Sequence, residues 1–152
     1  MIPRAMLAPI AFVAACGAPT GPSPREEFDR ARARWEAQGL VSYQFELTRS
    51  CYCVLGGQTM KVEVAGGVVV GAEHLDSGIG IDTELFSYIP TIPDLFDLIE
   101  DAVGRPMARF FASYDPSLGY PTRIELDYAA EAVDDESTIV IRNVIPAREA
   151  SP

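Results

Sequence analysis

The stretch that decides the fold spans residues 41–49 and reads Val-Ser-Tyr-Gln-Phe-Glu-Leu-Thr-Arg. Apolar and polar residues alternate along it, so that Val41, Tyr43 and Phe45 share one side. Successive side chains of a β-strand point to opposite faces of the sheet, and a period of two therefore predicts a strand with one buried face. We expect a sheet whose apolar side is covered by other elements of the chain.

Similar patterns elsewhere predict the partners of this strand. Gly66-Gly67 favours a hairpin turn between two neighbouring strands, whereas residues 74–90 lack a regular pattern and are expected to be irregular. The expected strands lie at residues 41–49, 60–64, 68–70, 108–114, 123–128 and 137–144.

Two helices are predicted from capping patterns. Ser23, followed by Pro24 and then by Glu26 three residues after the serine, is typical of a helix start. Thr91 begins a second such pattern, and Gly104 lies where a helix C-terminal cap belongs. Apolar residues recur at helical spacing in both segments, so each helix is expected to bury one side.

The expected elements define an α+β domain. Their order is α-β-β-β-α-β-β-β, and hairpins between neighbours predict a single antiparallel sheet of about six strands with both helices packed on one face. The two αβββ halves hint at an internal repeat, although their residues show none. We expect this single domain to span residues 24–145 and residues 146–152 to form a disordered tail.

The N-terminal residues are typical of an export signal. Arg4 precedes a mostly apolar run that ends in Val13-Ala14-Ala15 and is shorter than the about 20 apolar residues of a membrane-spanning helix. This ending and the next residue, Cys16, resemble the bacterial lipobox, which implies cleavage before Cys16 and acylation of that cysteine; an ordinary secretory signal is the alternative. We therefore expect a signal peptide at residues 1–15 and a lipidated cysteine with a flexible tether at residues 16–23.

The expected anchor and the charge of the chain limit its partners. The anchor would hold the domain at a membrane of the bacterial cell envelope. Gly17 follows the cysteine in place of the Asp that retains many lipoproteins in the inner membrane, which favours the outer membrane of a diderm host, facing the periplasm. The formal net charge of −10 argues against nucleic acids as ligands and suits solubility, cationic partners or divalent metals.

The two remaining cysteines, Cys51 and Cys53, form an isolated pair. In an exported protein such a pair is expected to be oxidised to a disulfide. Residues two apart in a regular strand lie near the upper limit of the Cα separation that a disulfide tolerates, so a local kink is needed. Continuing the alternation of residues 41–49 turns both sulfurs toward the core, which favours a structural role over a redox dithiol.

A turn motif follows the fourth expected strand and reads Tyr-Asp-Pro-Ser-Leu-Gly-Tyr-Pro at residues 114–121. Asp115 and Gly119 are of residue types that stabilise a tight turn. Tyr114 and Tyr120 can close a small aromatic cluster over this turn. A binding lip built from these two tyrosines is the alternative to a purely structural hairpin.

These features together resemble a family of short bacterial lipoproteins that is catalogued as a domain of unknown function. The resemblance rests on the turn motif, on Cys51-Tyr52-Cys53 after the first strand, and on the acidic step Asp134-Asp135-Glu136 before the last strand. It covers roughly residues 25–144 and brings no activity with it, so no catalytic residue is carried over.

Residues that carry chemistry are few. His74 is the only histidine, and no nucleophile motif, phosphate loop or dinucleotide fingerprint occurs, so we expect neither an enzyme nor a bound cofactor. Four acidic residues around the last loop offer oxygen ligands for Ca²⁺, although their spacing matches no established calcium loop and a solvated acidic loop is the simpler interpretation. These residues are Asp127, Asp134, Asp135 and Glu136.

The sequence therefore predicts a lipid-anchored envelope lipoprotein of unknown biochemical role that acts as a non-enzymatic binding module. The membrane, through the N-terminal lipid, and an envelope protein are its expected partners, the latter bound through the sheet face or the turn region. Two alternatives stay open. One is a calcium-dependent module that uses the acidic loop near Asp134, and the other is a thiol–disulfide protein that uses Cys51 and Cys53.

Overall fold

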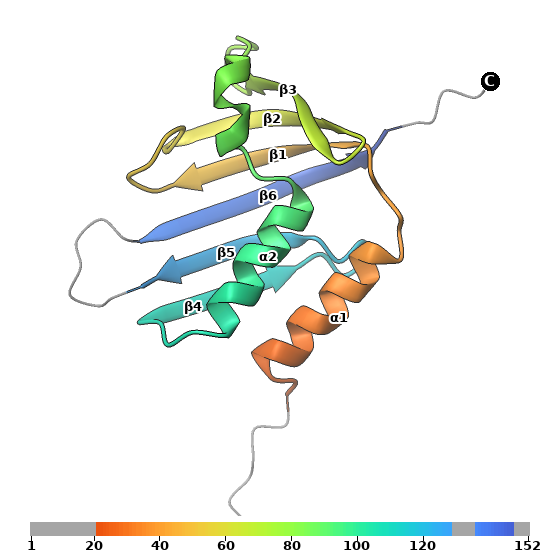
Figure 1. The fold of residues 1–152 in the computed structure, drawn as a ribbon, viewed down its shortest axis with the longest axis vertical. Coiled ribbons are helices and arrows are strands. Elements are labelled where there is room, and N and C mark those ends of the chain that lie inside the picture. Colours follow the sequence, from red (N-terminus) through yellow and green to blue (C-terminus); the bar gives the residue numbers. More distant parts are fainter. Residues whose placement is uncertain (1–20, 129–135, 148–152) are drawn as a thin grey trace, which may run out of the picture.

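The structure is a computed structural model, and it describes residues 21–128 and 136–147 (Figure 1). The helices are α1 (Pro24–Glu36) and α2 (Ile92–Val103), with a 3-10 helix η1 (Thr83–Tyr88) before α2. The strands are β1 (Tyr43–Ser50), β2 (Gln58–Ala65), β3 (Val68–His74), β4 (Arg109–Tyr114), β5 (Pro121–Asp127) and β6 (Ser137–Pro146). The strands form one antiparallel sheet in the order β3-β2-β1-β6-β5-β4.

Both α-helices begin at the capping patterns of the sequence. At α1, the Ser23 hydroxyl accepts a hydrogen bond from the backbone N–H of Glu26, and the Glu26 carboxylate accepts one from the N–H of Ser23. At α2, Thr91 and Asp94 make the same reciprocal pair. Each pair satisfies backbone donors that a helix start otherwise leaves without a partner.

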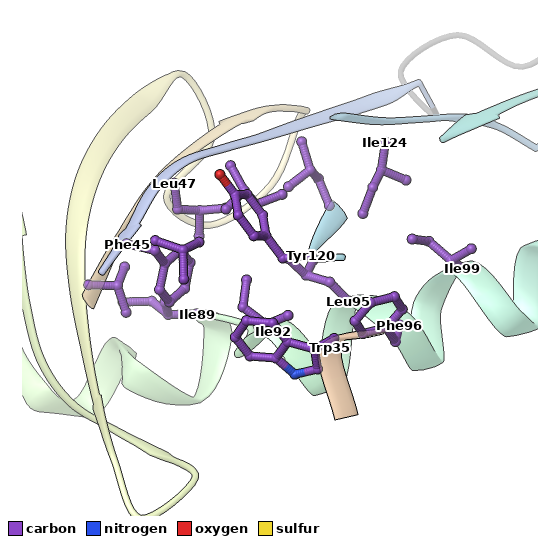
Figure 2. Close-up of a cluster of buried hydrophobic side chains, with 14 of the residues drawn as sticks. Trp35, Phe45, Leu47, Ile89, Ile92, Leu95, Phe96, Ile99, Tyr120 and Ile124 are labelled. Atoms are coloured by element: carbon purple, nitrogen blue, oxygen red, sulfur yellow. The ribbon is translucent and has the colours of Figure 1, made fainter. Parts of the chain in front are cut away.

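The helices lie on one face of the sheet, and the core fills the space between the two layers (Figure 1). Tyr43, Phe45 and Leu47 of β1 point into this core and are fully buried, so the apolar side of residues 43–47 faces the helices. Val41, expected on the same side, precedes β1 and is exposed. Figure 2 shows Trp35 of α1 and Ile92 of α2 meeting the sheet side chains from below. The opposite face of the sheet carries the polar residues of the same strands.

The element order expected from the sequence was wrong between β3 and α2. This segment was expected to be irregular, yet it contains η1, and the observed order is α-β-β-β-η-α-β-β-β. The Asp82 side chain caps η1 by accepting a hydrogen bond from the N–H of Glu84. A 3-10 helix of six residues buries no continuous stripe, so it leaves no apolar period in the sequence.

The topology also argues against the internal repeat. β1, the first strand of the first half, lies at the centre of the sheet beside β6, whereas β4, the first strand of the second half, lies at an edge. A repeated unit would place both first strands at equivalent positions. In the central pair Leu47 lies opposite Ile141, and β6 continues to Pro146, one residue past the expected end of the domain.

Candidate functional site

A groove crosses the open face of the sheet, opposite the helices. Two adjoining hollows, of about 230 Å³ and about 600 Å³, share Gln44 and Glu63 in their walls. Gln44 lies in register between Glu63 of β2 and Ile145 of β6, so the hollows follow one line across the strands. We call this feature the open-face groove; its main lining residues are Gln44, Lys61, Glu63, Gly71, Glu73 and Ile145.

Two β-bulges flank the groove. In β3, Val70 is an extra residue between the pairs Glu63–Gly71 and Val64–Val69. In β6, an irregularity between Arg142 and Ile145 places Asn143 in the left-handed region with a φ of 52°, and it turns Ile145 onto the open face. Bulges bend a strand and re-aim its side chains, and they are common beside functional sites.

A missing side chain deepens the groove. Gly71 lies opposite Glu63, and a Cβ built on Gly71 would come within 3.4 Å of Glu63 Oε2, in ordinary contact. A larger residue would therefore fit sterically at position 71, but it would fill the hollow. The glycine keeps the floor of the groove open between β2 and β3.

The groove carries more negative than positive charge. Lys61 Nζ lies 3.5 Å from Glu73 Oε1, and the strand register places Glu46 on the other side of Lys61. Glu63 follows Lys61 by two residues and shares its face. Within the described residues, no ion pair reaches Glu46 or Glu63. Glu46 has Arg142 opposite it on β6, and it does not line the groove. The lining residues themselves hold one lysine and two carboxylates, Glu63 and Glu73, and this net negative charge attracts cationic groups.

The predicted disulfide is present, but its sulfurs do not point into the core. β1 ends at Ser50, so the alternation stops before Cys51, which is half-buried, while Cys53 is exposed. Their Cα atoms lie 5.3 Å apart, inside the usual range for a disulfide. The kink that the spacing requires is the turn after β1, and Tyr52 at its tip is 90% exposed.

The turn motif at residues 114–121 packs against α1. Asp115 Oδ1 accepts hydrogen bonds from the N–H groups of Ser117 and Leu118. Gly119, with a φ of 89°, lies so close to α1 that a Cβ there would clash with the carbonyl oxygen of Ala31 and other atoms of that helix. The motif therefore fixes the β4–β5 hairpin to the first helix.

The two tyrosines of the proposed binding lip lie mostly inside the fold. Tyr120 is 8% exposed and belongs to the core, and burial raises the pKa of its phenol. Tyr114 is half-buried, and its ring stacks on Phe96 with centroids 6.5 Å apart. Burial raises the pKa of Tyr114 to about 12, with a smaller contribution from the negative charge of Glu27.

The remaining candidate residues are only partly covered by the structure. Cys16, Asp134 and Asp135 lie outside the described residues. Asp127 lies opposite Arg109 in the β4–β5 pair and is half-buried, and Glu136 is exposed. Over residues 21–128 and 136–147, no three His, Cys, Asp or Glu side chains gather in a way that could hold a metal ion.

The groove residues were not singled out from the sequence. One signal was available, because Gly71 interrupts the apolar run Val68-Val69-Val70, and an isolated glycine in a strand indicates a bulge. The alternation of β1 and β2 also assigns Gln44 and Glu63 to the wet face. The second bulge also has a marker, because Asn143 breaks the apolar alternation of Ile139 and Ile141 and is of a residue type that enters the left-handed region more often than most.

These features define the class of the protein: an α+β domain whose six-stranded antiparallel sheet is covered by helices on one face and open on the other. The chain belongs to a family described as "Family of unknown function (DUF6174)", whose model matches residues 27–146. Comparison with curated proteins and with solved structures finds no match. In the part of the chain that the structure describes, no helix is long and apolar enough to cross a membrane.

Proposed function

We propose that this protein is a lipid-anchored envelope lipoprotein whose open-face groove binds a basic, extended segment of another envelope protein. The anchor part of the proposal rests on the lipobox-like residues that end in Cys16. The observation that carries the binding part is the groove itself. It is a concave, mainly acidic hollow on a sheet face that the helices leave uncovered.

The shape of the groove favours an extended segment. The hollows lie in line across β3, β2, β1 and β6, and their combined size is in the range of sites that hold small ligands or a few side chains. Ile145, 60% exposed, and Ala65 supply an apolar end, while Glu63 and Glu73 supply a polar end. An extended segment with basic side chains at one end and apolar side chains at the other matches both ends.

The charge of the groove favours a basic segment. Glu46 and Glu63 have no ion-pair partner within the described residues, and the whole chain carries a formal charge of −10. Complementary charge steers association and selects partners, even where it adds little to affinity. A cationic side chain near Glu63 would relieve the excess of carboxylates around Lys61.

Fluorescence anisotropy with two short labelled peptides tests the binding part. A Lys-Val peptide with three lysines followed by three valines is expected to bind, and a peptide with three glutamates followed by three valines is not. Glu63→Lys is expected to weaken binding of the Lys-Val peptide about tenfold. Glu84→Lys, at an exposed acid on η1 away from the groove, is the matched control and should change little. Equal binding of both peptides, or equal loss in both variants, would refute the proposed site.

Photo-crosslinking in bacterial cells tests the partner. A crosslinking amino acid at position 44 of the full chain should capture a protein of the envelope, whereas the same amino acid at position 84 should not. Adding Glu63→Lys to the chain that carries the crosslinking amino acid at position 44 should reduce the amount of crosslinked product. A product that forms equally from both positions would show non-specific contact and would count against the groove.

A further inference from the structure

The two edges of the sheet are protected unequally. Beside β3, residues 79–81 run as an extra antiparallel segment. The His74 N–H donates to the Ile79 carbonyl at 2.9 Å, and the Ile81 N–H donates to the Ala72 carbonyl at 2.8 Å. This segment occupies outward backbone groups in the C-terminal half of β3, at Ala72 and His74. Proteins commonly protect sheet edges in this way, because a free edge is a template for another strand.

The β4 edge has no such cover within the described residues. β4 pairs with β5 alone, and no loop or turn backbone hydrogen bond reaches residues 109–114. The strand reads Arg-Phe-Phe-Ala-Ser-Tyr and contains neither proline nor glycine, and its exposed Phe111 is 46% accessible. Lysine, proline and bulges on the edge strand itself are the usual devices against strand addition, and β4 has none of them.

The hydrogen-bonding groups on this edge can be assigned by alternation. The Asp115 N–H donates to the Tyr120 carbonyl across the hairpin, so the amide of residue 115 points toward β5. Backbone amides along a strand point alternately to its two sides. The N–H and C=O groups of Phe110, Ala112 and Tyr114 therefore point away from β5, toward the free side.

We propose that β4 pairs antiparallel with β4 of a second copy of this chain, with the two-fold axis at Ala112, so that the two sheets continue into one another. This register places Phe110 opposite Tyr114 and Phe111 opposite Ser113. It also places Arg109 opposite Asp115 of the other copy. Symmetry makes each of these pairs occur twice.

Charge and side-chain size make β4 complementary to itself. Its one charged residue, Arg109, precedes the strand centre by three positions; it pairs with Glu125 of β5 at 2.8 Å and keeps an exposed side chain. The acid Asp115, whose Oδ1 caps the turn, follows that centre by three. Opposite charges across two strands stabilise the pair, and like charges destabilise it. The small residue Ala112 lies at the axis, where two copies of the same side chain must approach each other. β3 offers a shorter free edge, because residues 79–81 already pair with its C-terminal half.

A small hollow beside the edge receives the aromatic side chains of the second copy. It measures about 120 Å³ and lies between the start of α1, at Pro24 and Glu27, and the β4 residues Phe110, Ala112 and Tyr114. In the proposed register, Phe110 of one copy lies next to Tyr114 of the other at this hollow. Aromatic cross-strand pairs are among the more stabilising contacts between strands.

Crosslinking of the full chain in the membranes of expressing bacteria tests this pairing. Phe111→Cys places a thiol on the β4 edge, and Val70→Cys places one on the β3 edge at nearly equal exposure, 46% against 49% for the native side chains. A short bismaleimide should convert the Phe111→Cys chain into a product of twice the chain mass. The yield from Val70→Cys and from the unmodified chain, which carries the native cysteines, should be about tenfold lower.

Two further changes, made in the Phe111→Cys chain, probe the backbone and the charges. Ala112→Pro removes an outward N–H that the pairing needs and should therefore abolish the dimer. The variant should still fold, because an edge strand tolerates proline where the N–H points away from the sheet. Arg109→Glu leaves the backbone intact, places like charges at both ends of the pairing, and should lower the yield about tenfold. Because it also removes the ion pair between Arg109 and Glu125 within one chain, Glu125→Gln, which removes that ion pair and keeps Arg109, is the control and should leave the yield unchanged. If Ala112→Pro does not fold, as judged by circular dichroism, Arg109→Glu decides alone.

Four results would overturn the proposal. They are failure of the Phe111→Cys chain to crosslink, equal product from both edges, an undiminished dimer in Arg109→Glu, and a Phe111→Cys product whose mass corresponds to a different protein. None of these results bears on peptide binding at the open-face groove, which lies on the sheet face and not on the β4 edge.

Discussion

Replacing Gly119 by alanine should destabilise the fold more than any other single methyl addition at a described glycine with positive φ. Gly119 has a φ of 89°, in the region that favours glycine. Its Cβ would also clash with the carbonyl oxygen of Ala31 and lie 2.9 Å from the backbone nitrogen of Trp35. Both neighbours are backbone atoms inside α1, so they cannot move without displacing the helix.

The expected cost has two parts. A non-glycine residue at this φ costs about 1–2 kcal/mol, and forcing an extra group into a packed contact costs about 1–3 kcal/mol. The free energy of unfolding should therefore fall by about 2–5 kcal/mol, out of the about 5–15 kcal/mol typical of a domain. For a domain of this size, the melting temperature should fall by about 8–20 °C.

Gly78→Ala is the matched control, because it separates the two parts. Gly78 has a φ of 67° and no atom within 4 Å of a built Cβ, so alanine there meets only the conformational cost of about 1–2 kcal/mol. Urea unfolding of both variants, followed by circular dichroism, gives the difference. If Gly119→Ala is no more destabilising than Gly78→Ala, the contact between the turn motif and α1 does not have the role argued above.

The remaining predictions concern three other residues. Tyr43 Oη accepts a hydrogen bond from the buried N–H of Ile92 at 3.0 Å, so Tyr43→Phe should cost about 1–3 kcal/mol in urea unfolding at neutral pH. Burial raises the pKa of Tyr43 from 10.0 to about 12, so the unfolded chain loses this proton at a lower pH than the folded chain. The free energy of unfolding should therefore fall as the pH rises from 10 to 12, and Tyr43→Phe should make this fall less steep. An unchanged slope in Tyr43→Phe would contradict the assignment of the raised pKa to Tyr43. Cys51→Ser opens a very small ring and should lower stability by about 1–2 kcal/mol, whereas reducing agent should have no further effect on that variant. Cys16→Ser should move the protein from the membrane to the soluble fraction of expressing bacteria and abolish labelling by a fatty-acid analogue; a variant still labelled and membrane-bound would exclude lipidation at Cys16.

Local sequence rules account for the helix starts and for the covered face of the sheet. Ser23 and Thr91 are N-caps because their side chains satisfy backbone donors within the same four residues, and such short-range chemistry is legible in the sequence. The alternation around Phe45 assigns the buried face in the same way, since it depends on one strand alone.

Features that depend on distant residues were missed. The bulge near Asn143 exists because β6 must keep Val144 in the core while pairing with β1, which lies far away in the sequence. The outward position of Cys53 follows from the end of β1 at Ser50, and strand ends are set by pairing rather than by alternation. The open-face groove combines four strands, so no single segment indicates it.

The central position of β6 has a consequence for the synthesis of this protein. β1 has β2 on one side and β6 on the other, and β6 is the last strand of the chain to be made. Until β6 arrives, the first three strands have an open edge where the middle of the finished sheet will be. Contacts this distant in sequence form slowly, so we expect the sheet to complete only after β6 has been made. A truncation before Ser137 would therefore remove the centre of the sheet, not its margin.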